Sequence, residues 1–313
     1  MKRALTYTLT ALLALPFLTT TSACAKPKTK KQTTKIAAQT KYPLLGDPKS
    51  KYRGWDYLVG RLKREGIRES DLAAIYQDPR MPRFTFIPFK LKPRESSSIY
   101  STFDKRKFHE LGASFIQRHG QEFDRLEQKY KVPREVVTSI LVIETQIGQH
   151  TGDQLVVHRL SRLASVLDPH NLKENLRRHR LEDASVTMQD LQERGRYLED
   201  TFLQEVPALI EISKRNQVNV FHIKGSTAGA FGIPQFLPSA FLKYGVDGDG
   251  DGHVSLFNEI DALWSAGNYL STCGYRPELS YEERRKVIWQ YNKSDAYIDA
   301  VFQMSEGIRA LLA

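Results

Sequence analysis

Residues 225–261 constrain the chain most, because two unusual segments follow each other there. The first, GSTAGAFGIPQFLPSAF, is rich in glycine and alanine and carries two isolated polar side chains, Ser226 and Gln235. Small residues let a bulky ligand approach the backbone, and the two polar groups can orient it. The second, VDGDGDGH, alternates carboxylates with glycines, as a tight loop around a hard cation requires. Together they predict a site for a polar ligand beside a metal loop.

The acidic loop matches the start of an EF-hand calcium loop but not its end. Its alternating carboxylates are Asp247, Asp249 and Asp251. They are followed by Gly252, which completes the D-x-D-x-D-G opening. The twelfth position is Asn258 instead of the usual glutamate, so the last carboxylate must come from Glu259 or Asp261. His253 lies inside the loop, where its backbone carbonyl is the expected ligand. The alternative is a solvated acidic turn without a metal.

One glutamate occupies an unusual place in a predicted helix that begins at Pro133, where a missing N–H does no harm. The apolar stripe of this helix is formed by Val137, Ile140 and Leu141. Glu144 is the next position on the same stripe. Burial disfavours the charged carboxylate and raises its pKa, so Glu144 is a candidate proton donor near neutral pH. The alternative is a core glutamate paired with an arginine or with backbone N–H groups. The nearby Gly148 and Gly152 favour a cleft wall.

The spacing of apolar residues predicts a mainly α-helical chain with no series of strands. Residues 79–98 are rich in proline and read as irregular, and residues 170–200 read as an exposed helical excursion. Helices are expected over 55–62, over 72–77 with Ser70 as the N-cap, in one long segment from 108 to 126, and over 201–214, 236–244, 260–272, 281–291 and 295–312.

The N-terminal residues predict export. Lys2 and Arg3 precede the apolar stretch Ala4–Leu18, which is typical of a secretory signal over residues 1–24. Two alternatives remain for its processing: acylation of Cys24, which ends the lipoprotein-like sequence TSAC, or cleavage after Ala25. A disordered, lysine-rich tether is expected over residues 25–45. The other cysteine is Cys273, so no intramolecular disulfide is expected.

The formal net charge of +10 does not indicate a nucleic-acid partner, because of where the charge lies. Two positive charges belong to the signal and six lysines belong to the tether, which leaves +2 over residues 43–313. The tether is expected to be a solvated spacer, or to interact with an anionic envelope surface.

Four segments in the same order resemble the B-type lytic murein transglycosylases of bacteria. They are EQKYKVPREVVTSILVIETQIG, KGSTAGAFGIPQFLPS, VDGDGDGHVSLFNEIDA and YNKSDAY. The likeness runs from about Leu126 to the C-terminus, with a weaker echo from Tyr100. It implies a lysozyme-like α domain over 126–313 with an inserted calcium loop at 247–261. It also implies an additional helical N-terminal region over 46–125.

The same resemblance implies roles for individual residues. Glu144 would be the single acid and base. The sugar subsites would be lined by Ser226, Gln235, Asn292 and Tyr297. The calcium ion would be held by Asp247, Asp249, Asp251, His253 and Asp261. The chain departs from the family pattern at Pro234, where glycine is usual, at Phe241, where tyrosine is usual, and over 168–200. Arg177 and Arg178 in that segment are candidates for a glycan-contacting arginine pair, but they do not align with it.

The implied reaction explains why the sequence offers one convincing catalytic carboxylate, although most glycosidases need two. In lytic transglycosylases the 6-hydroxyl of N-acetylmuramic acid attacks its own anomeric carbon, so no second carboxylate has to activate water. The expected partner is the peptidoglycan glycan strand, and the expected enzyme is a periplasmic or outer-membrane-anchored monomer. The alternatives are a muramidase that hydrolyses the same bond and a catalytically silent peptidoglycan-binding protein.

Overall fold

The computed structural model describes residues 42–92 and 100–313, most of which are helical. The helices are α1 (Asp56–Arg64), α2 (Glu69–Tyr76), α3 (Arg106–Arg118), α4 (Gly120–Tyr130), α5 (Arg134–Thr145), α6 (Val156–Leu163), α7 (Pro169–Glu182), α8 (Met188–Phe202), α9 (Glu205–Arg215), α10 (Pro238–Tyr244), α11 (Glu259–Thr272), α12 (Tyr281–Tyr291) and α13 (Asp295–Leu312), with 3-10 turns η2 (Ser101–Asp104) and η3 (Val220–His222). Two short strands, β1 (Gln154–Leu155) and β2 (Lys224–Gly225), pair antiparallel. The predicted mainly α fold class is confirmed.

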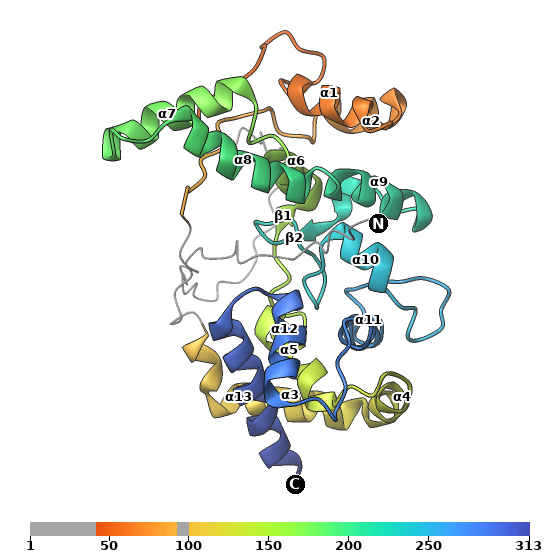
Figure 1. Cartoon of the computed structure of the whole chain (residues 1–313). Helices are drawn as coiled ribbons and strands as arrows, with labels where there is room; N and C mark the ends of the chain where they lie inside the picture. The colour runs from red at the N-terminus through yellow and green to blue at the C-terminus, as the bar shows by residue number, and fades with distance from the viewer. Residues whose placement is uncertain (1–41, 93–99) are drawn as a thin grey trace, which may run out of the picture.

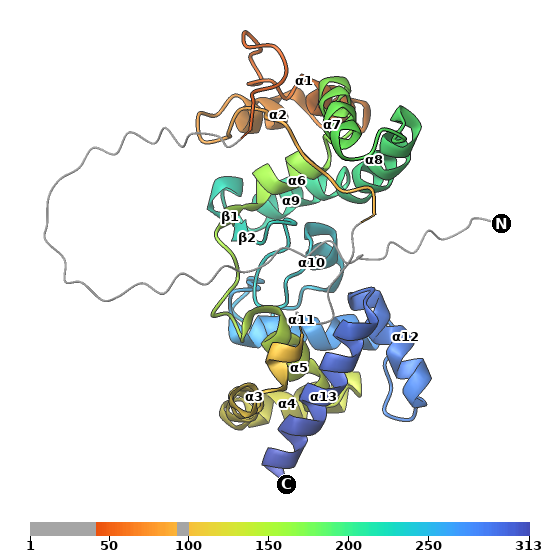
Figure 2. The ribbon, with the colours of Figure 1, turned by 90° about the vertical axis from the view of Figure 1, so that its left-hand side faces the viewer.

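The helices form two groups with a thin layer of other structure between them (Figure 1, Figure 2). We call α1, α2 and α6–α9 the upper helices, and α3–α5 and α11–α13 the lower helices. The strands β1 and β2, the loop that follows them and the short helix α10 lie between the two groups (Figure 2). One continuous hydrophobic core runs through the lower helices, this layer and the upper helices.

Helix α5 is the centre of the lower group, where it packs against α13, α3, α11 and α4. Every residue from Val136 to Ile143 is buried, so the helix is covered on all sides. The single apolar stripe predicted for this helix is therefore too narrow. The C-terminal end of α5 leaves this enclosed core: Glu144 is partly exposed, and the next residue, Thr145, hydrogen-bonds the loop between the two helix groups at Ile233.

Two predicted helix boundaries in the N-terminal half are wrong. Helix α2 begins at Glu69, so Ser70 lies inside it and is not its N-cap. The predicted long helix over 108–126 is two helices that meet at His119. The apolar positions continue through this break, so periodicity alone could not reveal it. The His119 ring instead forms a 2.8 Å contact with the Glu259 carboxylate at the start of α11.

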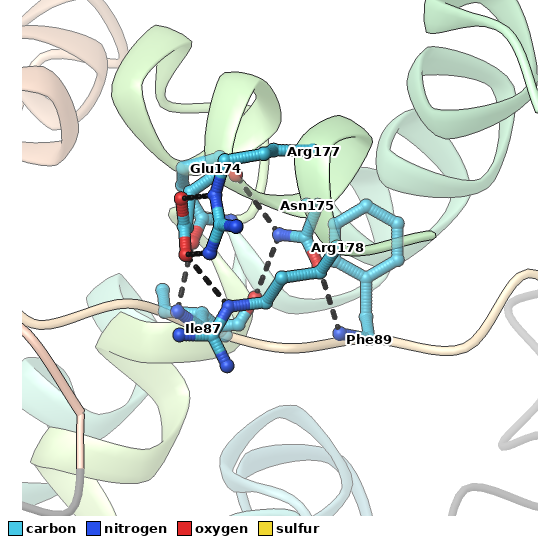
Figure 3. A network of polar contacts seen from close by, with 7 residues as sticks. Ile87, Phe89, Glu174, Asn175, Arg177 and Arg178 are labelled. Atoms are coloured by element: carbon cyan, nitrogen blue, oxygen red, sulfur yellow. Dashed lines mark hydrogen bonds and ion pairs between the residues drawn. The ribbon is translucent and has the colours of Figure 1, made fainter. Parts of the chain in front are cut away.

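The segment predicted as an exposed excursion is only partly exposed. It forms α7 and α8, and Asn171 and Asn175 of α7 are buried. Asn171 accepts a hydrogen bond from the Ile87 N–H at 2.8 Å, and Asn175 donates to the Ile87 carbonyl at 3.0 Å. The side-chain oxygen of Asn175 also accepts a hydrogen bond from the Phe89 N–H at 3.4 Å (Figure 3). Buried amides on α7 therefore hold the extended segment that follows Phe86, and this part of the excursion prediction was wrong.

The predicted signal and Cys24 lie outside the described residues. Residues 42–45 of the predicted tether are described, and Leu44 forms an isolated antiparallel bridge with Thr85. Within 42–92 and 100–313, the helices are too short or too polar to span a membrane. The predicted boundary between the helical N-terminal region (46–125) and the lysozyme-like domain (126–313) falls inside α4, which packs against α5 and α11.

Candidate active site

Glu144 lies one residue before the end of α5, where the backbone turns sharply out of the helix. Gln146 and Ile147 have φ angles of 52° and 55°, in the left-handed region that non-glycine residues seldom adopt. The turn is held by Thr145, whose hydroxyl donates to the Ile233 carbonyl at 2.8 Å and accepts from the Gly148 N–H at 2.9 Å. This turn joins the end of α5 to the glycine-rich segment 225–237.

The Glu144 carboxyl is desolvated, although part of the residue remains exposed. Burial raises the pKa of Glu144 to about 7, and a hydrogen bond from Tyr297 opposes this rise. The Tyr297 hydroxyl donates to Oε1 of Glu144 at 2.8 Å. Among the described side chains, no arginine, lysine or second carboxylate makes a hydrogen bond or ion pair with it. A carboxyl in this environment exchanges its proton near neutral pH.

Tyr297 and its neighbours form an aromatic wall behind the carboxyl. Tyr297 is 1% exposed, and its ring lies parallel to that of Tyr291 with a centroid distance of 6.3 Å. Tyr100 meets Tyr297 edge-on at 5.7 Å. The Tyr291 hydroxyl donates to the Pro234 carbonyl at 2.5 Å, so the wall is tied to segment 225–237. Tyr291 begins the segment YNKSDAY, in which only Asn292 and Tyr297 were predicted to be site residues.

Segment 225–237 runs back and forth beside this wall. Gly225 pairs with Gln154 in the β ladder, and Phe231 forms isolated bridges with both Gly225 and Phe236. A Cβ on Gly152 would lie 2.2 Å from the Gly225 carbonyl oxygen, and Gly152 has a φ of 92°, so only glycine allows this close approach. The loop that follows α5 and segment 225–237 are therefore in direct backbone contact.

Gln235 is 7% exposed and has a φ of 51°. Its side-chain Nε2 donates to the carbonyls of Thr151 and Gly232 at 3.1 Å and 2.9 Å. Gln235 follows Ile233, whose carbonyl binds Thr145 at the end of α5, by two residues, and its amide nitrogen is already bound to the protein. A small hollow lined by Gln235, Phe236 and Tyr291 adjoins it.

Two other predicted site residues carry buried polar atoms without a protein partner. These atoms are Oγ of Ser226 and Oδ1 of Asn292. Both residues as a whole are partly exposed. A buried polar atom that makes no hydrogen bond costs free energy, so each atom would gain from a ligand hydroxyl or amide. Ser226 is in segment 225–237, and Asn292 follows α12, so polar groups without partners come from both sequence motifs.

The acidic loop, residues 247–261, brings together three of its five predicted ligands. Carboxylate oxygens of Asp247, Asp249 and Asp261 lie within 4.8 Å of one another. Asp247 accepts the N–H groups of Gly250 and Gly252 at 2.7 Å and 2.9 Å. Such close carboxylates repel one another, and hard cations prefer oxygen ligands, so the three residues fit a hard cation.

The other loop residues make different contacts. The Asp251 carboxylate is outside the cluster of three and accepts the His253 N–H at 2.8 Å. The His253 side chain is exposed. Glu259 contacts His119, whereas Asp261 is 1% exposed and accepts the N–H groups of Gly248 and Ser255. Asp261 therefore supplies the last carboxylate of the cluster.

Arg177 and Arg178 are on α7 of the upper helices, whereas Glu144 is on α5 of the lower helices (Figure 1, Figure 3). Both guanidinium groups bind Glu174, with N–O distances of 2.8 Å and 2.7 Å. Arg178 also lies over the Phe86 ring at 4.3 Å. Glu174 therefore binds both guanidinium groups but neutralises only one of the two positive charges.

The family comparison agrees with the predicted resemblance. The model of the transglycosylase SLT domain matches residues 51–285. The membrane-bound lytic murein transglycosylase B of Escherichia coli is 28% identical over 164 residues, which are 52% of this chain and 38% of that protein. The match thus spans well under half the length of that relative.

Three solved structures share the fold. The lytic transglycosylase SltB1 of Pseudomonas aeruginosa has a TM-score of 0.63 at 22% identity, covering 84% of this chain and all of that one. Escherichia coli Slt35 in complex with calcium has a TM-score of 0.59 at 18% identity, covering 86% and 96%. Pseudomonas aeruginosa SltB3 in complex with NAG-anhNAM-pentapeptide has a TM-score of 0.60 at 18% identity, covering 83% and 80%.

The family match covers most of the described residues, and it includes Glu144, segment 225–237 and the acidic loop. The prediction made from the four sequence segments is confirmed, and the chain belongs to the transglycosylase SLT domain family.

Proposed function

We propose that this protein is a lytic transglycosylase that cleaves the MurNAc-β-1,4-GlcNAc bond of peptidoglycan and leaves a 1,6-anhydroMurNAc end. The observation that carries the proposal is the Glu144 carboxyl: burial raises its pKa to about 7, and no second carboxylate among the described residues makes a hydrogen bond with it. The relatives named as lytic transglycosylases, and the peptidoglycan fragment bound by SltB3, support the substrate class.

In the proposed reaction, protonated Glu144 donates its proton to the glycosidic oxygen as the C1–O bond breaks. The 6-hydroxyl of the same MurNAc then bonds to C1, and the Glu144 carboxylate takes the hydroxyl proton. The protein thus returns to its starting state, and the two products together have the mass of the substrate. Burial keeps Glu144 protonated close to neutral pH, as the first step requires. Holding the 6-hydroxyl near C1 replaces an encounter with water.

Ser226, Gln235 and Asn292 are proposed to bind the sugars. The buried Ser226 Oγ and Asn292 Oδ1 lack protein partners, and a glycan supplies hydroxyl and acetamido groups that could pair with them. Tyr297 was predicted to face the sugars, but its buried hydroxyl donates to Glu144. We therefore assign Tyr297 to the orientation of the Glu144 carboxyl.

We propose that Asp247, Asp249 and Asp261 hold a structural calcium ion. The ion would neutralise the crowded carboxylates and stabilise the connection between α10 and α11. The calcium bound by Slt35 supports this choice of metal. No proton-transfer step is assigned to the loop. The Asp251 carboxylate and the His253 side chain are outside the proposed ligand set.

The decisive experiment is analysis of the products released from purified sacculi, before and after borohydride reduction. A lytic transglycosylase gives anhydroMurNAc ends that resist reduction, and the Glu144→Gln protein gives none. Products that carry one additional water and are reducible would identify a muramidase instead. Binding to sacculi without any product would identify a silent binding protein.

We also propose that the protein is exported and anchored through Cys24, as the name of the membrane-bound relative suggests for that protein. Cys24→Ser should move the protein from the membrane pellet to the soluble fraction. A wild-type protein that is already soluble and begins at Lys26 would contradict anchoring.

A further inference from the structure

A second buried glutamate, Glu205, lies between two helices and takes no part in the proposed reaction. It is the first residue of α9 and is 2% exposed. Its Oε2 accepts the Ser239 N–H at 2.8 Å, and its Oε1 accepts the Ser239 hydroxyl at 2.7 Å. Both carboxylate oxygens are therefore bound to one residue in the first turn of α10.

Glu205 provides the side-chain acceptor that the N-cap residue of α10 lacks. Leu237 occupies the N-cap position of α10 and makes no side-chain capping bond. The first N–H groups of a helix need acceptors from outside the helix, and the carboxylate of Glu205 supplies one. It also lies at the positive end of both α9 and α10, which favours its charged form. Burial acts in the opposite direction and raises the pKa of Glu205.

The first turn of α10 continues directly from the candidate active site. All residues from Phe231 to Pro238 are buried, and Gln235 precedes Ser239 by four residues. Gln235 holds a left-handed backbone conformation with a φ of 51°, which is unfavourable for a residue with a side chain. Such a conformation persists when the surroundings hold it on both sides. The Phe231–Phe236 bridge closes the turn that contains Gln235, and the contact between Glu205 and Ser239 fixes the backbone where the chain leaves this turn.

We propose that Glu205 is a positioning residue, which anchors the first turn of α10 and thereby holds Gln235 in its substrate-binding position. This inference rests on the proposed function and assigns a role that Glu144 and the sugar-contacting residues do not fill. Glu205 acts through hydrogen bonds rather than proton transfer. The defect after its removal should appear in substrate binding, and therefore in KM more than in kcat.

The test compares Glu205→Gln with Glu205→Leu on purified sacculi. A glutamine can accept the Ser239 N–H through its oxygen and donate to the Ser239 hydroxyl, so it preserves both contacts. A leucine of similar size preserves neither. We expect KM to rise about tenfold in Glu205→Leu with kcat within about twofold, and Glu205→Gln to stay within about threefold of wild type. Only the leucine leaves the two partly buried donors of Ser239 without an acceptor.

Glu199 provides a matched control. It is equally buried in α8, but its carboxylate binds Tyr57 and Arg61 of α1, far in sequence from segment 225–237. Glu199→Leu should lower the Tm while leaving KM unchanged for the folded protein. An equal rise of KM in Glu199→Leu would overturn the proposal, as would an unchanged KM in Glu205→Leu. Loss of kcat in Glu205→Gln would show instead that Glu205 transfers a proton.

Two further measurements keep the proposal testable. If Glu205→Leu does not fold, Ser239→Ala removes one of the two contacts and should raise KM about threefold, since it loses a single hydrogen bond. An unchanged KM would then contradict the proposal. If the wild type has no activity, the proposed function fails, and hydrogen exchange still tests the anchor. The backbone amides of residues 235–241 should stay protected from exchange in Glu205→Gln and should exchange faster in Ser239→Ala. Equal exchange rates in Ser239→Ala and wild type would refute the role of Glu205 as an anchor.

Discussion

The site around Glu144 and the acidic loop both rely on carboxylates, but the protein surrounds these carboxylates differently. Glu144 stands alone at the end of a buried helix, and the Tyr297 hydroxyl is its hydrogen-bond partner among the described side chains. The carboxylates of Asp247, Asp249 and Asp261 crowd together and accept backbone N–H groups. A lone desolvated carboxyl keeps its proton to higher pH, whereas crowded carboxylates repel one another until a cation binds. The first arrangement suits proton transfer, and the second suits ion binding.

The largest expected effect tests the first half of this comparison. Glu144→Gln should lower the rate of muropeptide release by about 10²–10⁴-fold, because that is the usual contribution of a positioned acid or base. The variant should fold, since the amide occupies the same volume. Release is measured by chromatography of the soluble products. A variant with more than a few per cent of wild-type activity would show that another group transfers the proton.

The same variant has a predicted effect on stability. The pKa of Glu144 is raised from its ordinary 4.5 to about 7 in the folded protein. Its contribution to stability is fully present below the unfolded pKa and is lost as pH rises through the folded pKa. As the pH rises from about 4.5 to 7, wild type loses this contribution and Glu144→Gln does not, so the variant becomes the more stable of the two. The difference in the free energy of unfolding should reach roughly 1–3 kcal/mol, a value reduced by the partial exposure of the side chain. A difference that does not depend on pH would contradict the raised pKa.

The second effect concerns the acidic loop and should appear in stability rather than chemistry. Calcium at a hundredfold excess over Kd should stabilise the fold by about 2.7 kcal/mol if it binds the native state alone. Asp249→Ala should abolish this gain and leave kcat unchanged well below the Tm. Thermal unfolding with calcium and with chelator measures it.

Asp251→Ala is the matched control for that experiment. The sequence places Asp251 in the ligand set, whereas the structure leaves its carboxylate outside the cluster of three. Asp251→Ala should keep most of the calcium-dependent rise in Tm. Equal losses in both variants would favour the ligand set implied by the sequence. If the wild type has the same Tm with calcium and with chelator, the proposed metal site is wrong.

The comparison also explains how much the sequence could predict. The acidic loop is local, so the alternation of aspartate and glycine reveals it directly. The position of Glu144 on a helix was also readable, because apolar spacing is a local signal. Its contact with Tyr297 joins residues 153 positions apart in the chain. Without the resemblance, nothing in the local pattern near either residue indicates that contact.

Other features escaped the sequence for related reasons. The break between α3 and α4 lies inside a continuous apolar pattern, and the residue at the break contacts Glu259 of another helix. Asn171 and Asn175 look like polar surface residues, but they are buried because they hydrogen-bond the backbone of a distant segment. The predicted helix over 201–214 places Glu205 in its interior, whereas α9 begins at Glu205. In each case a tertiary contact decided what the local pattern left open.

A smaller effect should appear when the Tyr297 hydroxyl is removed. The hydrogen bond from Tyr297 lowers the pKa of Glu144, so Tyr297→Phe should raise that pKa above about 7. Activity that requires protonated Glu144 is lost as pH rises through its pKa. The alkaline limb of kcat/KM should therefore move to higher pH in the variant. Tyr291→Phe is the control, because its hydroxyl donates to the Pro234 carbonyl. An equal shift in both variants would contradict a specific effect of Tyr297.

The smallest expected effect separates binding from stability at the sugar site. Ser226 Oγ is buried without a partner in the free protein, so Ser226→Ala should not lower the Tm. The same change removes a hydrogen bond that a glycan would supply, worth about 0.5–1.5 kcal/mol or roughly a 2- to 13-fold rise in KM. Thr138 Oγ1 is also buried without a partner, but Thr138 lies in the enclosed part of α5. Thr138→Val should therefore preserve KM. A rise in KM in Ser226→Ala but not in Thr138→Val would identify Ser226 as a substrate contact. A KM of Ser226→Ala equal to that of wild type would show that Ser226 does not bind the substrate.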